Sequence, residues 1–304
     1  MSRLVWVPFD PAELGEVPAG LRFETIDPTK DEVPASVADV EVYVPPYHMS
    51  PSVADVLPRM TSLRVIQTLS AGVDSIRARV PEGVVLCNGR GIHDTSTAEL
   101  TVALTLASLR EVPRYVRQQD RGEWRRGFTQ SLADKRVLIV GYGAIGAAIE
   151  SRLTPFECEV VRVARTARDG VHAVAQLPEL LPDADVVVLI LPLTEESRGL
   201  VDEGFLARMK QGALLVNMAR GAIVDTGALV EALHAHRVRA ALDVVDPEPL
   251  PADHPLWHAP GVLISPHNGG ASSAMRPRAM RLVREQLERY VAGRPLINVM
   301  TGAY

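Results

Sequence analysis

One short segment constrains the fold of this chain more than any other: three glycines with the spacing GxGxxG, in Gly141-Tyr-Gly143-Ala-Ile-Gly146. The segment follows the apolar run 136–140 and precedes the helix-favouring residues 147–149. Between a strand and a helix, the first glycine allows a tight turn, the second lets the backbone approach a pyrophosphate, and the third lets the helix pack on the strand. This context predicts a dinucleotide-binding turn; a purely structural glycine-rich turn is the alternative.

The apolar runs around this turn predict an α/β protein. After residue 135, six short runs alternate with helical patterns, which is typical of a parallel sheet covered by helices. These runs are 137–140, 160–164, 186–191, 213–217, 240–244 and 262–265. Runs that precede them indicate a smaller α/β unit, and they span 4–7, 40–44, 65–69 and 84–86.

Two helical patterns suggest how these parts are connected. Ser96 and Glu99 have the spacing of a capping box, which predicts a long helix that starts near residue 96. An amphipathic pattern over 280–291 is long enough to return to the first unit. We therefore expect two Rossmann-like or flavodoxin-like domains with parallel sheets. A dinucleotide-binding domain at 95–274 is then inserted into a discontinuous substrate domain at 1–94 plus 275–304.

Charge and cysteine usage exclude several classes of protein. The 304 residues include 32 Lys and Arg against 37 Asp and Glu, and this balance disfavours general binding to nucleic acid or to anionic membranes. The apolar start at 4–7 is too short for a signal-peptide core or a membrane span, so we expect a cytoplasmic protein. Cys87 and Cys158 lack the spacing of zinc or redox sites, so no metal is expected.

The end of the second strand in the larger unit predicts a preference for NADP(H), with NAD(H) as the alternative. An acidic residue at this position binds the ribose hydroxyls of NAD. Here Ala164 occupies the position, and Arg165 and Arg168 follow. A guanidinium can bind the 2′-phosphate of NADP through two hydrogen bonds. An arginine that is merely solvated after the strand is the other explanation.

Three polar side chains follow the last three strands of this unit: Arg220, Glu248 and His267. Ligands of open α/β sheets bind outside the carboxyl ends of the strands, so we expect these residues to meet in one crevice. A guanidinium can hold a carboxylate and polarise a ketone, an imidazole can protonate the new alkoxide, and a carboxylate can orient the imidazole. The pattern therefore predicts the reduction of a 2-oxo acid, although each residue alone is more often structural.

From about residue 60 to residue 295 the chain resembles the D-isomer-specific 2-hydroxyacid dehydrogenase family, in particular its NADP-type glyoxylate and hydroxypyruvate reductases. The motifs that carry the resemblance are Ser70-Ala-Gly-Val-Asp74, Thr97-Ala-Glu99, the turn from Gly141 to Gly146, Leu191-Pro-Leu-Thr194, Asn217-Met-Ala-Arg-Gly221, 243–250 and Pro266-His-Asn-Gly-Gly270. The resemblance implies that Arg220 and His267 bind the substrate. It also implies that His267 is the acid/base and that Glu248 orients its imidazole.

Further binding residues and a homodimer are implied by the same resemblance. Backbone amides around Ala71 and Gly72 would bind the substrate carboxylate, and Asp243 would contact the nicotinamide end of the cofactor. The residues expected to bind the cofactor are Thr97, Gly141, Tyr142, Gly143, Ala144, Ile145, Gly146, Arg165, Thr166, Leu191, Pro192, Met218, Ala219 and Asp243. Tyr47 and His48, after an expected strand, either shape the substrate pocket or are ordinary loop residues.

We therefore expect hydride transfer from NAD(P)H to C2 of a short 2-oxo acid such as glyoxylate or hydroxypyruvate, which yields a D-2-hydroxy acid. Two alternatives stay open. One is a dinucleotide-sensing interaction protein on the same fold, against which the intact set of Arg220, Glu248 and His267 argues. The other is a formate- or phosphite-type dehydrogenase, whose substrate has no ketone to protonate.

Overall fold

The computed structural model describes residues 2–47 and 51–301, and the chain divides into two compact units. Unit 1 is Met1–His93 with Ser272–Tyr304, and unit 2 is Asp94–Ala271. Each unit contains one parallel sheet with helices, which confirms the predicted α/β class. His48 lies outside the described residues. Within the described ranges, no helix is both long enough and apolar enough to cross a membrane.

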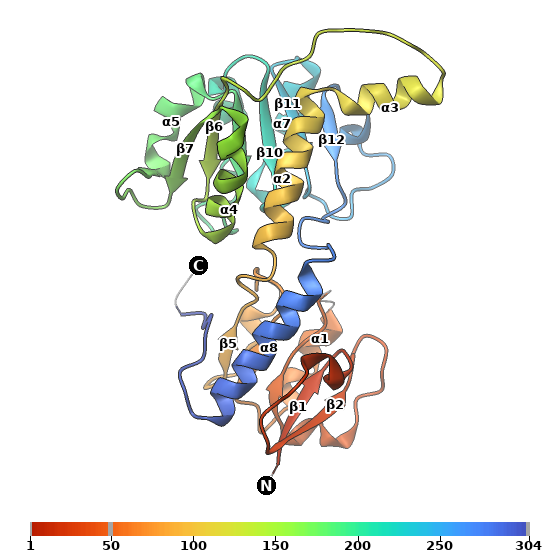
Figure 1. The fold of residues 1–304 in the computed structure, drawn as a ribbon, viewed down its shortest axis with the longest axis vertical. Helices are drawn as coiled ribbons and strands as arrows, with labels where there is room; N and C mark the ends of the chain where they lie inside the picture. The colour runs from red at the N-terminus through yellow and green to blue at the C-terminus, as the bar shows by residue number, and fades with distance from the viewer. Residues whose placement is uncertain (1, 48–50, 302–304) are drawn as a thin grey trace. The chain divides into compact units, whose positions relative to one another are not determined.

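Unit 2 is built on a seven-stranded sheet in the order β12-β11-β10-β9-β6-β7-β8 (Figure 1). The strands are β6 (Arg136–Val140), β7 (Glu159–Ala164), β8 (His172–Ala173), β9 (Val186–Leu189), β10 (Ala213–Asn217), β11 (Val238–Leu242) and β12 (Val262–Ile264). The order reverses at β6, because β7 lies on one side of it and β9 on the other. In doubly wound sheets such a reversal opens a crevice at the carboxyl ends of the strands.

Helices cover both faces of this sheet. They are α2 (Asp94–Leu109) and α4 (Ala144–Leu153) on one face, and α5 (Leu177–Leu180), α6 (Glu203–Arg208) and α7 (Thr226–His234) on the other. Helix α3 (Val112–Asp120) follows α2 and has no buried residue. The helix expected near residue 96 is α2, but the capping box predicted at Ser96 and Glu99 was wrong. The helix already includes residues 94 and 95, so Ser96 lies inside it and is buried.

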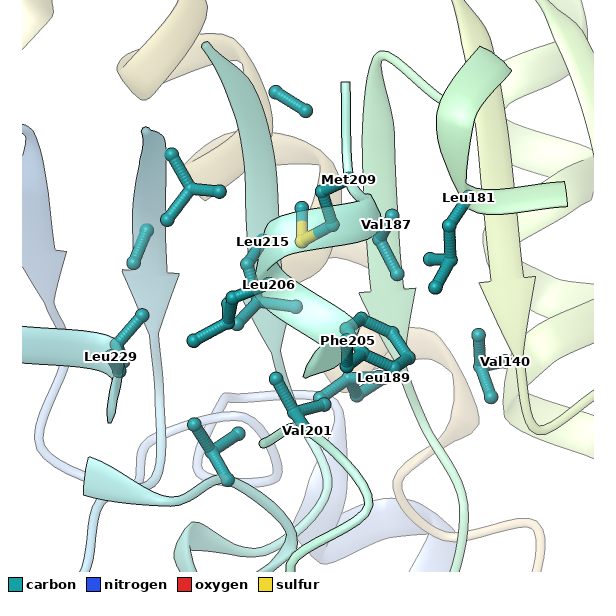
Figure 2. Close-up of a cluster of buried hydrophobic side chains, with 14 of the residues drawn as sticks. Val140, Leu181, Val187, Leu189, Val201, Phe205, Leu206, Met209, Leu215 and Leu229 are labelled. Carbon is teal, nitrogen blue, oxygen red and sulfur yellow. The ribbon is translucent and has the colours of Figure 1, made fainter. Parts of the chain in front are cut away.

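Alternate residues of the strands form two apolar cores, one on each face. Val187, Leu189 and Leu215 pack with Phe205 and Leu206 of α6, as Figure 2 shows. The intervening strand residues, such as Ile139 and Val188, pack on the other face against α2 and α4. Because both faces are buried, the strands are continuous apolar runs, and each buried side chain contributes roughly 1.5–3 kcal/mol.

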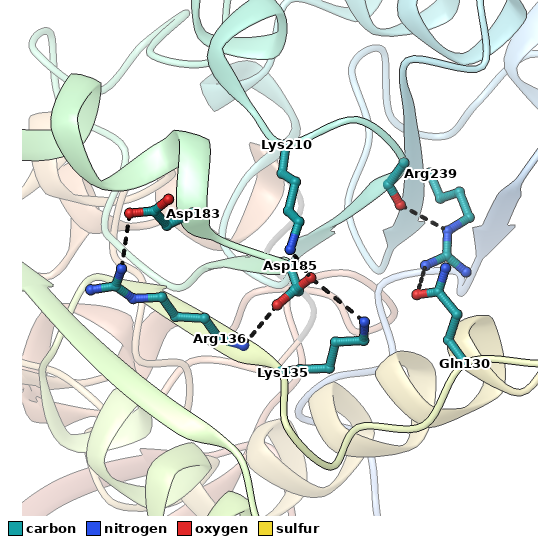
Figure 3. Close-up of polar contacts among 8 residues, drawn as sticks. Gln130, Lys135, Arg136, Asp183, Asp185, Lys210 and Arg239 are labelled. Carbon is teal, nitrogen blue, oxygen red and sulfur yellow. Dashed lines mark hydrogen bonds and ion pairs between the residues drawn. The ribbon is translucent and has the colours of Figure 1, made fainter.

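Polar contacts hold the amino-terminal edge of the unit 2 sheet, where β6 and β9 begin (Figure 3). The carboxylate of Asp185 accepts hydrogen bonds from the Arg136 amide at 3.0 Å and from Lys210 at 2.8 Å, and Lys135 lies 3.6 Å away. Burial alone would raise the pKa of Asp185, but the two hydrogen bonds and the charges of the two lysines lower it below its usual value. The network is far along the strands from their carboxyl ends, so we assign it a structural role.

Unit 1 has a five-stranded sheet in the order β2-β1-β3-β4-β5, which is flavodoxin-like. The strands are β1 (Arg3–Val7), β2 (Leu21–Thr25), β3 (Val40–Tyr43), β4 (Val65–Gln67) and β5 (Val85–Cys87). Its helices are α1 (Pro51–Asp55) and the long α8 (Met275–Val291), with a short 3-10 helix η1 (Pro11–Leu14) against α8. The buried face of α8 consists of Ala279, Val283, Gln286 and Leu287.

Candidate active site

The glycine-rich turn joins β6 to α4 at the point where the strand order of unit 2 reverses. Gly141 has φ of +109°, and a Cβ there would lie 2.4 Å from the carbonyl oxygen of Ile190. A Cβ on Gly146 would lie 2.7 Å from the carbonyl oxygen of Gly141, so α4 packs directly on the turn. At Gly143 an added Cβ meets nothing within 4 Å. The turn therefore leaves open space at Gly143, in front of a helix N-terminus, which suits a pyrophosphate.

A cluster around Tyr142 fixes this turn. The Tyr142 hydroxyl donates to Glu150 of α4, and Glu150 also accepts from Nε of Arg162 of β7 at 2.8 and 2.9 Å. The hydrogen bond from Arg162 lowers the pKa of Glu150, whereas the hydrogen bond to Glu150 raises the pKa of Tyr142. The Arg162 guanidinium also lies over the Tyr142 ring, 5.6 Å from its centroid. Turn, helix and second strand are thus tied together.

The arginines predicted to bind a 2′-phosphate lie beside this cluster. Arg168 donates to the carbonyl oxygen of Tyr142 at 2.7 Å, and its guanidinium lies 5.9 Å from the ring centroid. Arg165 and Thr166 are exposed directly after β7. Within the described part of the chain, Arg165 makes no hydrogen bond or ion pair. One guanidinium is therefore held against the turn, and the other is available to a ligand.

The remaining residues predicted around the dinucleotide follow β6, β9 and β10. Ala144 and Ile145 form the first turn of α4. Leu191 and the exposed Pro192 follow β9, and the carbonyl oxygen of Pro192 accepts a hydrogen bond from the buried Ser197 at 2.8 Å. Ala219, after β10, is buried. All of these residues lie at the carboxyl edge of the sheet.

His267 and Glu248 are in contact, in loops that follow the adjacent strands β12 and β11. Nδ1 of His267 lies 2.5 Å from Oε1 of Glu248. The side chains are 47% and 39% exposed, so a ligand can reach them. A carboxylate on Nδ1 orients the ring and leaves Nε2 for a ligand. The structure thus brings together two of the three predicted catalytic residues.

Asp243 supports the loop that carries His267. The backbone of His267 has φ of +54°, in the left-handed region, which the surrounding structure must stabilise. Oδ1 of the buried Asp243 accepts hydrogen bonds from the Ser265 hydroxyl at 2.7 Å and the Asn268 amide at 2.8 Å, and Oδ2 accepts from the Gly269 amide at 2.8 Å. This geometry makes Asp243 a positioning residue, and its contact with nicotinamide stays a prediction.

Thr97 and Met218, two further residues predicted to bind the cofactor, lie buried against the same loop. The Thr97 hydroxyl donates to the carbonyl oxygen of Gly269 at 3.2 Å. A Cβ on Gly269 would lie 2.8 Å from Oδ2 of Asp243 and 3.3 Å from Cε of Met218. Because residue 269 is a glycine, the loop that carries His267 can pack closely against Asp243 and Met218.

Arg220 lies in the turn after β10, and a polar residue at the end of that strand holds the turn. Nδ2 of the buried Asn217 donates to the Arg220 carbonyl oxygen at 2.9 Å, and its Oδ1 accepts from the Ala219 amide at 3.0 Å. A Cβ on Gly221 would lie 1.9 Å from the carbonyl oxygen of Val245. The turn that carries Arg220 therefore packs backbone to backbone against the loop that leads to Glu248.

Asn217 and Ser265 are two positioning residues that were not predicted from the sequence. Asn217 ends the otherwise apolar strand β10, and Ser265 follows β12 directly. A polar side chain at such a point is a usable sequence signal, because buried polar groups need hydrogen-bond partners.

In unit 1, the three carbonyl groups of the loop from Ser70 to Gly72 all accept hydrogen bonds. The carbonyl oxygen of Ser70 accepts from the Thr68 hydroxyl and the Gly89 amide, and that of Ala71 accepts from Asn88 at 2.9 Å. The Ser70 hydroxyl donates to the Gly72 carbonyl oxygen at 2.7 Å. The amide of Gly72 has no hydrogen-bond acceptor among the described residues, so it can serve an anion.

A cavity of about 380 Å³ lies at the carboxyl ends of β1, β3 and β4 in unit 1. Its lining is largely apolar and includes Phe9, Tyr47, Leu69 and Met275. The Tyr47 ring packs on His93, with the ring centroids 5.3 Å apart. Leu69 directly precedes the loop that starts at Ser70, so the cavity and that loop are neighbours.

Comparison with known proteins gives a consistent picture. Residues 102–269 match the family described as D-isomer specific 2-hydroxyacid dehydrogenase, NAD binding domain. A D-3-phosphoglycerate dehydrogenase of Methanocaldococcus jannaschii is 33% identical over 90% of this chain and 54% of its own length. A glyoxylate reductase of Thermofilum pendens is 34% identical, over 82% of this chain and 75% of its own length.

Solved structures agree with these matches. The D-isomer specific 2-hydroxyacid dehydrogenase of Xanthobacter autotrophicus, in complex with NADPH and MES, is 29% identical and superimposes with a TM-score of 0.82. That alignment covers 99% of this chain and 98% of the solved one. By contrast, the chain spans about half the length of the D-3-phosphoglycerate dehydrogenase.

Proposed function

Because the chain belongs to the D-isomer-specific 2-hydroxyacid dehydrogenase family, we propose that it reduces a short 2-oxo acid at C2 to the D-2-hydroxy acid, with NADPH preferred over NADH. The observation that carries the proposal is the contact between His267 and Glu248 at the edge of the sheet that also holds the glycine-rich turn. Acids of the size of glyoxylate or hydroxypyruvate are the first candidates, since a glyoxylate reductase is among the relatives.

In this proposal His267 is the acid that protonates the substrate oxygen. Glu248 accepts the hydrogen on Nδ1, so Nε2 carries the proton that is transferred. Asp243 and its three donors keep the loop in the conformation that this transfer needs. The bound dinucleotide supplies the hydride.

Arg220 holds the substrate carboxylate and polarises the ketone through its guanidinium, and the hydrogen bonds of Asn217 fix the backbone turn that carries this side chain. In unit 1, the amides of Ala71 and Gly72 are proposed to bind a carboxylate. The hydrogen bonds to the carbonyl oxygens of that loop support this role, because they fix the conformation of the loop. The roles of the two domains, substrate binding at 1–94 plus 275–304 and dinucleotide binding at 95–274, are part of the same proposal.

The preference for NADPH rests on charge at the end of β7. Ala164 presents no carboxylate to repel a 2′-phosphate, and Arg165 and Arg168 lie within four residues of it. Arg168 is already held beside the turn by the Tyr142 carbonyl. The NADPH complex of the Xanthobacter autotrophicus relative is in keeping with this preference.

The test measures turnover by the purified chain in two directions. Reduction is assayed with NADPH or NADH and glyoxylate, hydroxypyruvate, pyruvate and bulkier 2-oxo acids. Oxidation is assayed with NADP⁺ or NAD⁺ and formate or phosphite. We expect turnover of at least one short 2-oxo acid, with the D-product where a stereocentre forms. Oxidation of formate or phosphite alone would contradict the proposal, because those reactions leave no alkoxide for His267 to protonate. Dinucleotide binding without any turnover would favour the sensing protein.

We also propose that the chain is a homodimer through α3 and the segment that follows it. No residue of α3 is buried, and five apolar side chains of this region are exposed: Val112, Tyr115, Val116, Trp124 and Phe128. Trp124 is 89% exposed. Monomeric proteins rarely leave contiguous apolar groups of this size in water, and a second copy of the same surface would bury them.

A further inference from the structure

A second cavity of unit 1, of about 550 Å³, lies between η1 and α8 and has no part in the proposed reaction. Three guanidinium groups line it, those of Arg276, Arg281 and Arg284, together with a single carboxylate, that of Glu13. The remaining lining residues are Leu14, Ser273, Pro277 and Met280. A volume of this size falls within the range of roughly 300 to 1,000 Å³ that is typical of small-molecule sites. The excess of positive charge is local, because the whole chain has a net charge of −5.

The three arginines differ in how their guanidinium groups are engaged. Arg276 forms two hydrogen bonds with Glu13, both of 2.5 Å. One nitrogen of Arg284 donates to the carbonyl oxygen of Leu14 at 3.4 Å, and its other nitrogens make no hydrogen bond with the described residues. Arg281 is exposed and makes neither a hydrogen bond nor an ion pair with the part of the chain that the structure describes. Two guanidinium groups therefore have donors left for a ligand.

The other arginines of α8 form hydrogen bonds within the protein, so the guanidinium groups with free donors are those that line the cavity between η1 and α8, which is called the groove below. Arg289 donates to Glu285 at 3.0 and 3.1 Å, and Arg278 donates to the carbonyl oxygen of Ala274 at 2.9 Å. Neither of them lines the cavity. The guanidinium groups of α8 that have free donors, those of Arg281 and Arg284, therefore both line this one cavity.

We propose that this groove binds a small anion with two or more negative charges, such as a polyphosphate group. Arg281 and Arg284 would each donate charge-assisted hydrogen bonds to its oxygens, and the planar guanidinium suits phosphate geometry. Glu13 opposes binding in two ways. Its carboxylate repels the anion, and it accepts two hydrogen bonds from the guanidinium of Arg276, which are then not available to the anion. The ligand is therefore expected to compete with Glu13 for that guanidinium.

Titration calorimetry of the full-length chain with inorganic tripolyphosphate at moderate salt tests this proposal. The double variant Arg281→Gln/Arg284→Gln is expected to weaken binding by at least about tenfold, as the loss of charge-assisted contacts implies. Glu13→Gln is expected to tighten binding about threefold or more. Arg59→Gln/Arg294→Gln removes the same charge from unit 1 outside the groove and serves as the control, for which we expect a change of less than about twofold.

Each titration is repeated in an Arg165→Gln background, because a polyphosphate can also occupy the proposed dinucleotide site. Equal affinity of the wild type and the Arg281→Gln/Arg284→Gln variant would overturn the proposal, as would binding that is lost in the Arg165→Gln background alone. Weaker binding in the control pair, equal to that in the groove variant, would show a general charge effect and overturn it too. The titration needs no turnover, so its outcome is separate from that of the substrate panel.

Discussion

At the scale of single residues, two carboxylates act on His267 in different ways. Glu248 contacts the ring at 2.5 Å, whereas Asp243 binds the backbone and side chains of the surrounding loop. The contact with Glu248 determines which ring nitrogen of His267 carries a proton, whereas the hydrogen bonds of Asp243 determine the position of the imidazole. A substitution of the histidine itself removes the first function and leaves the hydrogen bonds of Asp243 to residues 265, 268 and 269 in place.

We expect His267→Gln to lower turnover of the best 2-oxo acid by about 100- to 10,000-fold, which is the usual contribution of a general acid. Dinucleotide affinity, measured by fluorescence titration, should stay within a few-fold of the wild type. The matched control is His258→Gln, because His258 is an exposed histidine outside the site. Near-normal turnover in a folded His267→Gln protein would remove this residue from the mechanism.

Arg165 is the residue on which cofactor preference most directly depends. Arg165→Gln should weaken the binding of NADPH by up to about 10- to 150-fold, because charge-assisted hydrogen bonds to the 2′-phosphate are lost. The loss is smaller if solvent screens these hydrogen bonds. NADH affinity should change little, since NADH has no 2′-phosphate. Arg208→Gln, which removes an exposed charge from the end of α6, is the control. Equal NADPH and NADH affinity in the wild type would refute the preference.

At the scale of elements, helix α4 is attached to the strands by one ion pair as well as by apolar packing. Because the hydrogen bond from Arg162 lowers the pKa of Glu150, the folded state holds this proton less tightly than the unfolded state does. The stabilisation is therefore present above the ordinary pKa of 4.5. It is lost as the pH falls through the lower pKa of the folded state.

We accordingly expect Glu150→Gln to lower the thermal unfolding temperature near pH 7. The difference from the wild type should shrink as the pH falls below 4.5 and through the lower pKa of the folded state, because the wild-type carboxyl then becomes neutral as well. Thermal unfolding across this pH range measures it, with Glu179→Gln as the control, an exposed glutamate of α5. A difference that stays constant with pH would assign the effect to packing.

Much of the element order was predictable because apolar runs and glycines act locally. The strands β6, β7, β9, β10, β11 and β12 lie within the predicted runs to within two residues. The strands β2 and β8 were not predicted, since β2 alternates Leu21, Phe23 and polar residues and β8 has only two residues. The hydrogen bonds of Asp243 depend on the register of β11 and β12, which pairs Leu242 with Ile264 and which no local pattern specifies.

At the scale of the whole molecule, the proposed dimer has a direct test. Trp124→Asp/Phe128→Asp should convert a dimer into a monomer, because two exposed aromatic side chains are replaced by charges on the proposed interface. Light scattering after size-exclusion chromatography gives the mass. Trp257→Asp changes another exposed tryptophan of unit 2 and should leave the mass unchanged. A wild-type chain that is monomeric at micromolar concentration would refute the dimer.

The contact of Gly221 with the backbone near Val245 has a consequence for how such a protein can be redesigned. The spacing of the Arg220 turn from the loop that leads to Glu248 is set by main-chain atoms, so no exchange of side chains can adjust it. The apolar cavity beside Leu69, in contrast, is lined by side chains that can be exchanged one at a time. An engineer who seeks a new acid specificity should therefore build libraries in unit 1 and leave position 221 as glycine.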